Sequence, residues 1–183
     1  MRQPEDIYDE WLVLRSQQSD ASALAELVER WRPRLWRHAM RLSGLPEAAS
    51  DIAQQSWLAI IHGLPRLDDA ARFRRWAYQI VTHKSADWIR ERQRQRATTS
   101  SLNVDVPEPA NLVVTTTDDN AAALDAALGH LSSDHRVALS MFYVEEMSVA
   151  EIAEALSLPV GTVKSRLHYA RQELKCILKG EPK

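Results

Sequence analysis

The sequence is poor in the residues that tie a chain together covalently or bend it sharply. Among its 183 residues Cys176 is the only cysteine, so no internal disulfide can form. There are five glycines, and no segment sustains the alternation of apolar and polar residues typical of strands. The six histidines are scattered without the spacing of metal ligands. We therefore expect an all-α protein with no metal, no cofactor and no catalytic residues.

Long apolar runs are missing as well. No segment reaches the length needed to cross a membrane, and no signal peptide opens the chain. We therefore expect a cytoplasmic protein without membrane insertion. The apolar content of 45% is still enough to bury real cores. Cys176 falls on the last predicted helix, where we expect a partly buried thiol and not a nucleophile.

Charge is segregated along the chain although the net charge is only -2. Residues 70–96 carry eight Lys/Arg against two Asp/Glu, and residues 160–183 carry six against two. Between these basic blocks, residues 97–159 carry one Lys/Arg against ten Asp/Glu. Two basic blocks separated by an acidic one indicate two contacts with a polyanion such as nucleic acid.

The most informative stretch, from Ser148 to Arg171, predicts a short helix, a tight turn and a second helix. Ser148 and Glu151 have the S-x-x-E spacing of a capping box, and Pro159 suits the start of the second helix. The second helix is predicted to bury Val160, Val163, Leu167, Ala170, Leu174 and Leu178.

The opposite face of this second helix carries hydroxyl groups, an aromatic ring and cations. It holds Thr162, Ser165 and Tyr169, flanked by Lys164, Arg166 and His168. Such a face suits a helix that reads bases in the DNA major groove. The alternative is an ordinary helical hairpin with a solvated polar face.

Four helices are predicted in the first half, over residues 1–18, about 20–42, 47–63 and 73–92. Asp20 or Ser22 can cap the second helix, and Pro33 is expected to kink it. The first helix is expected to dock through Ile7, Trp11, Leu12 and Leu14. On the second helix, His38 is expected to be a core residue and not a metal ligand.

The third helix places Ile52, Trp57, Ile60 and Ile61 on its apolar face. Asp51, Gln54, Gln55 and Leu58 lie around an adjacent surface. This surface is either a plain solvated face or a polar contact for a partner helix.

The fourth helix interleaves cations with aromatic rings. Its core positions are predicted as Phe73, Trp76, Ala77, Ile80 and Val81, while Arg74, Arg75, Tyr78, Lys84, Arg90 and Arg92 project elsewhere. Cations that pair with phosphates and rings that stack on bases are what single-stranded nucleic acid requires. We expect Trp76 to be core, and leave Tyr78 open between core and base stacking.

Composition divides the chain into two small helical domains, residues 1–95 and 119–183, joined by a flexible linker over residues 96–118. The linker is rich in Thr, Ser, Pro and Asp. The second domain is expected to open with helices over residues 121–130 and after Ser132 or Ser133.

Taken together, the chain resembles the extracytoplasmic-function (ECF, group IV) RNA polymerase sigma factors of the sigma-70 family, from about Ala21 to Leu178. WRPRLWRHAMRL is similar to the opening of region 2, and DIAQQSWLAI to its polymerase-binding segment. LPRLDDAARFRRWAYQIV resembles the promoter-melting segment, and ADWIRER the segment that reads the -10 element. LSSDHRVALSMFYVEEMSVAEIAEALSLPVGTVKSRLHYARQEL matches the pattern of region 4.

The resemblance implies a role for each surface. Asp51, Gln54, Gln55 and Leu58 would contact the clamp helices of the largest polymerase subunit, and Phe142 and Tyr143 would dock on the flap. The -10 element would meet Arg66, Leu67, Arg72, Arg74, Arg75, Tyr78, His83, Lys84, Asp87 and Arg90, with the loop from Arg66 to Arg72 holding a flipped base. The -35 element would meet Thr162, Lys164, Ser165, Arg166, His168, Tyr169 and Arg171.

The implied function is to bind core RNA polymerase, direct it to promoter DNA and help to open it. An anti-sigma factor is implied as a further partner by the resemblance alone. The rival hypotheses are a free-standing helix-turn-helix regulator and an adaptor that uses these helices for contact only.

Some positions depart from the family pattern. His83 stands where Asn is frequent, Gln55 where Glu is frequent, and Ser157 where a turn glycine is frequent. Tyr169 stands where Arg is common, and it cannot make the bidentate guanine contact of an arginine. We therefore expect an altered preference in the -35 element.

Overall fold

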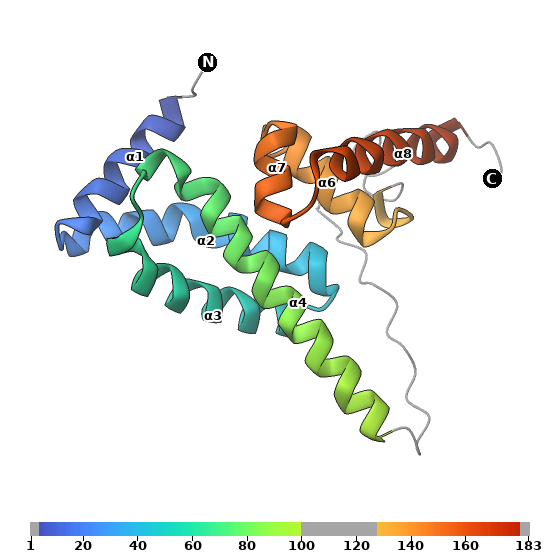
Figure 1. Cartoon of the computed structure of the whole chain (residues 1–183), viewed down its shortest axis with the longest axis horizontal. Coiled ribbons are helices and arrows are strands. Elements are labelled where there is room, and N and C mark those ends of the chain that lie inside the picture. Colours follow the sequence, from blue (N-terminus) through green and yellow to red (C-terminus); the bar gives the residue numbers. More distant parts are fainter. Residues whose placement is uncertain (1–3, 100–127, 180–183) are drawn as a thin grey trace, which may run out of the picture. The chain divides into compact units, whose positions relative to one another are not determined.

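A computed structural model of the chain describes residues 4–99 and 128–179. The chain divides into two compact units, Met1–Asn103 and Val104–Lys183. Every regular element in the described ranges is helical (Figure 1), which confirms the predicted all-α class. No helix within these ranges is long and apolar enough to cross a membrane.

Over its described residues, 4–99, the first unit has four α-helices and two short 3-10 turns. The α-helices are α1 (Pro4–Gln17), α2 (Ala21–Ser43), α3 (Pro46–Gly63) and α4 (Phe73–Thr99). The turns η1 (Leu64–Arg66) and η2 (Ala70–Arg72) lie between α3 and α4, where the sequence predicted a loop. Helix α2 packs against α1, α3 and α4, and α3 packs against α4 as well.

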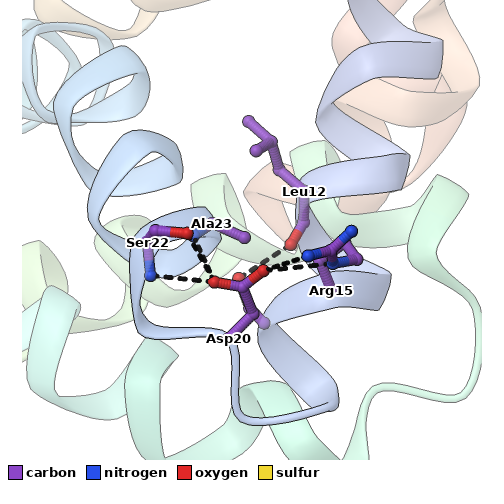
Figure 2. Close-up of polar contacts among 6 residues, drawn as sticks. Leu12, Arg15, Asp20, Ser22 and Ala23 are labelled. Carbon is purple, nitrogen blue, oxygen red and sulfur yellow. Dashed lines mark hydrogen bonds and ion pairs between the residues drawn. The ribbon is translucent and has the colours of Figure 1, made fainter.

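Polar side chains fix where α2 begins (Figure 2). Asp20 is its N-cap, and its carboxylate accepts from the backbone N–H groups of Ser22 and Ala23. Hydrogen bonds from the Ser22 hydroxyl, the Ala23 N–H and the Arg15 side chain hold the pKa of Asp20 well below its usual range. Arg15 approaches the same carboxylate to 2.6 Å from the end of α1. The turn between α1 and α2 is thereby fixed from both sides.

The core of the first unit is built around aromatic rings. Trp31 meets Phe73 edge-on with ring centroids 5.2 Å apart, and Tyr78 at 5.9 Å. His38 also meets Tyr78 edge-on, at 4.9 Å, and its Nε2 lies 3.0 Å from the Thr82 hydroxyl. His38 is therefore a satisfied core residue, as the sequence predicts.

Helix α1 docks through Leu12, as expected, but not through the other three residues predicted for its contact face. Leu12 and Val13 are fully buried, whereas Ile7, Trp11 and Leu14 are exposed. A polar contact between α1 and α2 explains this orientation. Buried Asp9 accepts from the indole N–H of Trp31 at 2.9 Å, which turns this side of α1 toward α2.

Helix α4 is longer than expected. It continues to Thr99, into residues that composition assigned to the linker, and Figure 1 shows its last turns running beyond the rest of the unit. The segment from Arg90 to Gln95 contains only good helix formers. Glu91 also pairs with Arg94 and Gln95 one turn on. The predicted linker residues 100–118 lie outside the described ranges.

The second unit is described from residue 128. It contains α6 (Ser133–Tyr143), α7 (Val149–Leu156) and α8 (Val160–Lys179). Ser132 caps α6, and Ser148 with Glu151 forms the predicted capping box of α7. The helix expected over residues 121–130 falls almost entirely outside the described ranges.

The turn between α7 and α8 depends on a strained serine. Ser157 ends α7 in the left-handed conformation with φ 54°, which glycine adopts more readily than serine. The Leu158 N–H then bonds back to the Ala153 carbonyl, 2.9 Å away, and Pro159 precedes α8. Val163, Leu167 and Ala170 of α8 are buried as predicted, Leu174 is half-buried and Val160 is exposed. The Leu178 side chain lies outside the part of the chain whose side chains the structure describes.

Candidate functional site

One candidate surface is the α3 face, which we define as Asp51, Gln54, Gln55 and Leu58. All four side chains are exposed, and Leu58 is 55% exposed. The opposite side of α3 is buried against α2 and α4. Exposed Ile61 continues the surface one turn further, although its spacing predicted a place on the apolar face of α3. An apolar patch beside amides and a carboxylate is suited to contact another protein.

The second candidate surface begins with the segment Leu64–Arg72, which joins α3 to α4. Arg66 and Arg72 are exposed, and Leu67 is half-buried. Asp69 caps η2 by accepting from the Ala71 N–H at 3.0 Å. The segment is thus a pair of hydrogen-bonded turns and not an open loop.

Gln17, at the end of α1, also holds this segment. Its side-chain Nε2 donates to the carbonyl oxygens of Leu64 at 2.9 Å and Leu67 at 2.8 Å. Sequence reasoning missed Gln17, because a lone glutamine 47 residues from its partner gives no local signal.

Helix α4 carries the basic part of the second surface. His83, Asp87 and Arg90 are exposed, and Lys84 is half-buried. Arg90 pairs with Asp87 at 2.6 Å, so this carboxylate offsets part of the local positive charge. Arg74 and Arg75 are half-buried, and Arg74 lies 3.4 Å from Asp6 of α1. The cations are therefore carried by the segment and α4 together.

Tyr78 is not part of this surface. Its side chain is 1% exposed and lies among Trp31, His38 and the rest of the core. Helix α4 packs against both α2 and α3, so its buried arc is wider than a single apolar stripe. Assigning Tyr78 to -10 DNA was therefore wrong. Trp76, which was expected in the core, is half-buried beside Phe73.

The third candidate surface is the α8 face. Lys164, Ser165, His168, Tyr169 and Arg171 are exposed, and Thr162 and Arg166 are half-buried. Tyr169 is the most prominent ring, at 59% exposed. Because the buried positions of α8 lie on the opposite side, the predicted DNA-reading residues share one accessible face. The face is thus open to solvent over most of its length, and only Arg166 and Arg171 at its edges reach a neighbouring helix.

Two cations of the α8 face are engaged with α6. Arg166 lies 2.6 Å from the Asp134 carboxylate. The Arg171 Nε donates to the Tyr143 hydroxyl at 2.9 Å, and the guanidinium stands over the rings of Phe142 and Tyr143 at 5.3 and 5.6 Å. The structure therefore brings a residue predicted to meet DNA into contact with the two residues predicted to dock on polymerase.

One titratable group has a strongly altered pKa. Burial, and to a smaller extent the positive charge of Arg41, lowers the pKa of His38 to about 3. This histidine lies in the core and faces none of the three surfaces. Within residues 4–99 and 128–179 no three His, Cys, Asp or Glu side chains come together as metal ligands would.

Family models match both units of the chain. Residues 27–95 match Sigma-70 region 2, and residues 121–174 match Sigma-70, region 4. The chain is 32% identical over 166 residues to ECF RNA polymerase sigma factor SigL of Mycobacterium tuberculosis, covering 87% of this chain and 91% of SigL. It is 28% identical over 168 residues to ECF RNA polymerase sigma factor SigW of Bacillus subtilis, covering 85% and 89%.

Two solved structures share the fold. Sigma factor RpoE of Bartonella quintana, in complex with the anti-sigma factor NepR, matches with a TM-score of 0.70 and 21% identity, covering 87% of this chain and 98% of RpoE. CnrH, in complex with the cytosolic domain of CnrY, matches with a TM-score of 0.64 and 23% identity, covering 96% and 99%.

Proposed function

The chain belongs to the ECF RNA polymerase sigma factors, and from this membership we propose how its surfaces divide the work of transcription initiation. A sigma factor directs RNA polymerase to promoters, and this chain does the same. The observation that carries the function is that both sigma regions are matched, in order, one on each compact unit. A free-standing helix-turn-helix regulator is not favoured, because it would leave the region 2 match on the first unit without a use.

In the proposed division, the α3 face binds the clamp helices of the largest polymerase subunit. Its exposed Leu58, with Ile61 beside it, offers apolar area to bury, and Gln54 and Gln55 offer both donors and acceptors. A partner helix laid along α3 would cover all of these side chains, because they recur at helical spacing.

The segment Leu64–Arg72 and the cations of α4 take up the single-stranded -10 element. Extruding a base from a duplex costs a few kcal/mol, so a pocket that is already formed favours opening. The two hydrogen-bonded turns give the segment a fixed shape before DNA binds, with Arg66 and Arg72 at its surface. His83, Lys84 and Arg90 continue the path along α4, and Arg74 and Arg75 lie at its start. Tyr78 has no part in this proposal.

The α8 face reads the -35 element from the major groove. Lys164 and Ser165 stand one turn before His168 and Tyr169, so they reach successive base steps. Thr162, Arg166 and Arg171 lie along the same helix. Phe142 and Tyr143 dock on the polymerase flap, and Arg171 joins this contact to the DNA face.

We extend the proposal to partners and location. RpoE and CnrH are both held by protein partners, and in RpoE the partner is an anti-sigma factor. An anti-sigma factor is accordingly proposed for this chain too. The chain acts in the cytoplasm, where bacterial polymerase meets DNA, and without cofactors. It is not an enzyme, because the chemistry of RNA synthesis belongs to the polymerase.

Reconstitution with bacterial core RNA polymerase tests the function. Run-off transcription from a library of linear promoters is expected to give discrete transcripts only when the chain is present. The aligned start sites then define the -10 and -35 elements. If the chain neither binds polymerase nor gives transcripts, the proposal is contradicted. Duplex binding without polymerase would favour the free-standing regulator.

A matched pair of leucines tests the α3 face. Leu58→Asp is expected to weaken polymerase binding at least about tenfold, because it buries a charge in the contact. Leu14→Asp makes the same change at a similarly exposed leucine of α1 and is expected to bind as the wild type does. Equal effects of the two substitutions would remove the α3 face from the proposal.

A further inference from the structure

The contact between Gln17 and the segment Leu64–Arg72 joins parts of the first unit that are far apart in sequence. The Gln17 side-chain Nε2 bonds to the carbonyls of Leu64 and Leu67, 47 and 50 residues away. An amide nitrogen carries two protons, so both donors of Gln17 are used. The two carbonyls stand at the start and just after the end of η1, and one side chain therefore fixes that turn across its whole length.

We infer that Gln17 is a positioning residue for promoter opening, which holds the segment Leu64–Arg72 in the form that receives single-stranded DNA. This inference rests on the proposed function of that segment. Gln17 itself need not touch DNA. It lies outside residues 27–95, which match Sigma-70 region 2, so the family match assigns it no role.

The hydrogen bonds within the segment are local, including that from the Ala71 N–H to the Asp69 carboxylate. Within it, the Leu67 N–H bonds to the Leu64 carbonyl at 3.1 Å and the Arg72 N–H to the Asp69 carbonyl at 2.9 Å. These bonds close η1 and η2 separately, and neither spans the residues between them. Gln17 supplies bonds that come from another element and end at Leu67, where η1 gives way to the exposed middle of the segment.

Helix α1 supports the segment at more than one point. It packs against both η1 and η2. At the far end of the segment, Asp6 of α1 lies 3.4 Å from Arg74 in the first turn of α4. Gln17 therefore contacts the first part of the segment, and Asp6, near the other end of α1, contacts α4 just beyond the segment.

The chemistry of the contact requires a donor at position 17. Both partners are carbonyl oxygens, which only accept. Methionine has nearly the shape of glutamine and no donor, so it would leave the two carbonyls without this partner. Lysine keeps N–H donors at the end of a flexible chain. Without the bonds, the segment becomes ordered only when DNA binds. The free-energy cost of this ordering then weakens binding.

The test compares three variants of the full-length chain, each with core polymerase. They are Gln17→Met, Gln17→Lys and, as a matched control, Gln18→Met at the adjacent exposed glutamine. The probe is a single-stranded oligonucleotide with the non-template -10 sequence of the strongest promoter from the run-off experiment. Polymerase binding and thermal midpoints are measured in parallel, so that loss of folding is separated from loss of DNA binding.

We expect Gln17→Met to bind this oligonucleotide about tenfold more weakly than the wild type, as two lost hydrogen bonds predict. Gln17→Lys is expected to stay within about threefold, and Gln18→Met to be unchanged. All three should bind polymerase normally. In the free chain, hydrogen exchange at the backbone N–H groups of residues 66–72 should rise in Gln17→Met alone, a readout that needs no promoter.

Two results would overturn the inference. One is Gln17→Met binding the oligonucleotide as tightly as Gln18→Met while exchange in the segment rises. The other is Gln17→Met and Gln17→Lys being equally weak, which would show that N–H donors at position 17 do not restore DNA binding. Failure of the wild-type chain itself to bind the oligonucleotide with polymerase would instead be a failure of the proposed function.

Discussion

Arg166 of α8 lies 2.6 Å from the carboxylate of Asp134, in the first turn of α6. A cation of the face proposed to read DNA is thus already paired with an anion of its own unit. Asp134 is more than half exposed, so the pair itself contributes little stability. Its effect is on DNA, because a phosphate must compete with Asp134 for Arg166.

Asp134→Asn is therefore expected to tighten binding of the full chain to -35 duplex DNA about two- to fivefold at low salt, the range of a weak surface pair. If Arg166 gains a phosphate, the logarithm of the binding constant should fall more steeply with the logarithm of salt concentration, by about one unit of slope. A salt titration of binding by fluorescence anisotropy measures both. Glu154→Gln, the same charge change at an exposed position of α7, is the control. An equal slope in the two variants would show that only overall charge matters.

The exposed ring of Tyr169 leads to a prediction about sequence preference. Tyr169→Arg is expected to shift the preferred -35 sequence toward guanine at the base it faces, by about 1–3 kcal/mol, because arginine can make a bidentate guanine contact. Selection from randomised -35 duplexes with the holoenzyme measures this preference. His168→Arg adds a cation to the neighbouring position and controls for charge. Unchanged promoter choice and affinity in Tyr169→Arg would remove Tyr169 from the reading face.

Buried His38 leads to a prediction about pH. Its pKa is lowered to about 3 in the folded chain, against about 6.5 in an unfolded one. Between these values the unfolded state binds a proton that the folded state does not. The free energy of unfolding should therefore fall as the pH falls below about 6.5, by about 1.4 kcal/mol per pH unit from this group.

Urea unfolding at pH 7 and pH 5, followed by tryptophan fluorescence, measures this loss. All six tryptophans lie between Trp11 and Trp88, so the signal reports on the first unit alone. His38→Gln keeps a polar group near the Thr82 hydroxyl and does not titrate. Between the two pH values, its free energy of unfolding should fall by about 2 kcal/mol less than that of the wild type. The same loss in both proteins would mean that other groups cause the pH dependence.

Gly63 leads to a prediction about packing at the end of α3. A Cβ at this position would lie 2.7 Å from Cζ2 of Trp76, closer than two non-bonded carbon atoms normally approach. Gly63→Ala should therefore destabilise the first unit by about 1–3 kcal/mol, because the indole or the backbone has to move. Scanning calorimetry measures the change. Gly161→Ala, where nothing lies within 4 Å of the added Cβ, should not destabilise the chain. Equal melting of Gly63→Ala and the wild type would show that Trp76 moves without strain.

The local features of the fold could be predicted from the sequence. The capping box of Ser148 and Glu151, the Asp20 cap and the exposed face of α8 depend on residues within two or three turns of one another. Helical spacing likewise predicted that Asp51, Gln54, Gln55 and Leu58 share one face of α3. Their exposure agrees with it. Such features follow from helical geometry and capping chemistry, which act over short stretches of chain.

Only the tertiary structure decided which of several plausible faces is covered. Tyr78 lies off the apolar stripe of α4, yet it is buried because α2 contributes Trp31 and His38 on that side. Gln17 finds its partners 47 and 50 residues away, and Arg166 finds Asp134 on another helix. The sequence determined where the helices begin and which side chains each of them offers, although α4 continues past its predicted end to Thr99. Burial and polar pairing between helices depend on how those helices pack, which no local pattern encodes.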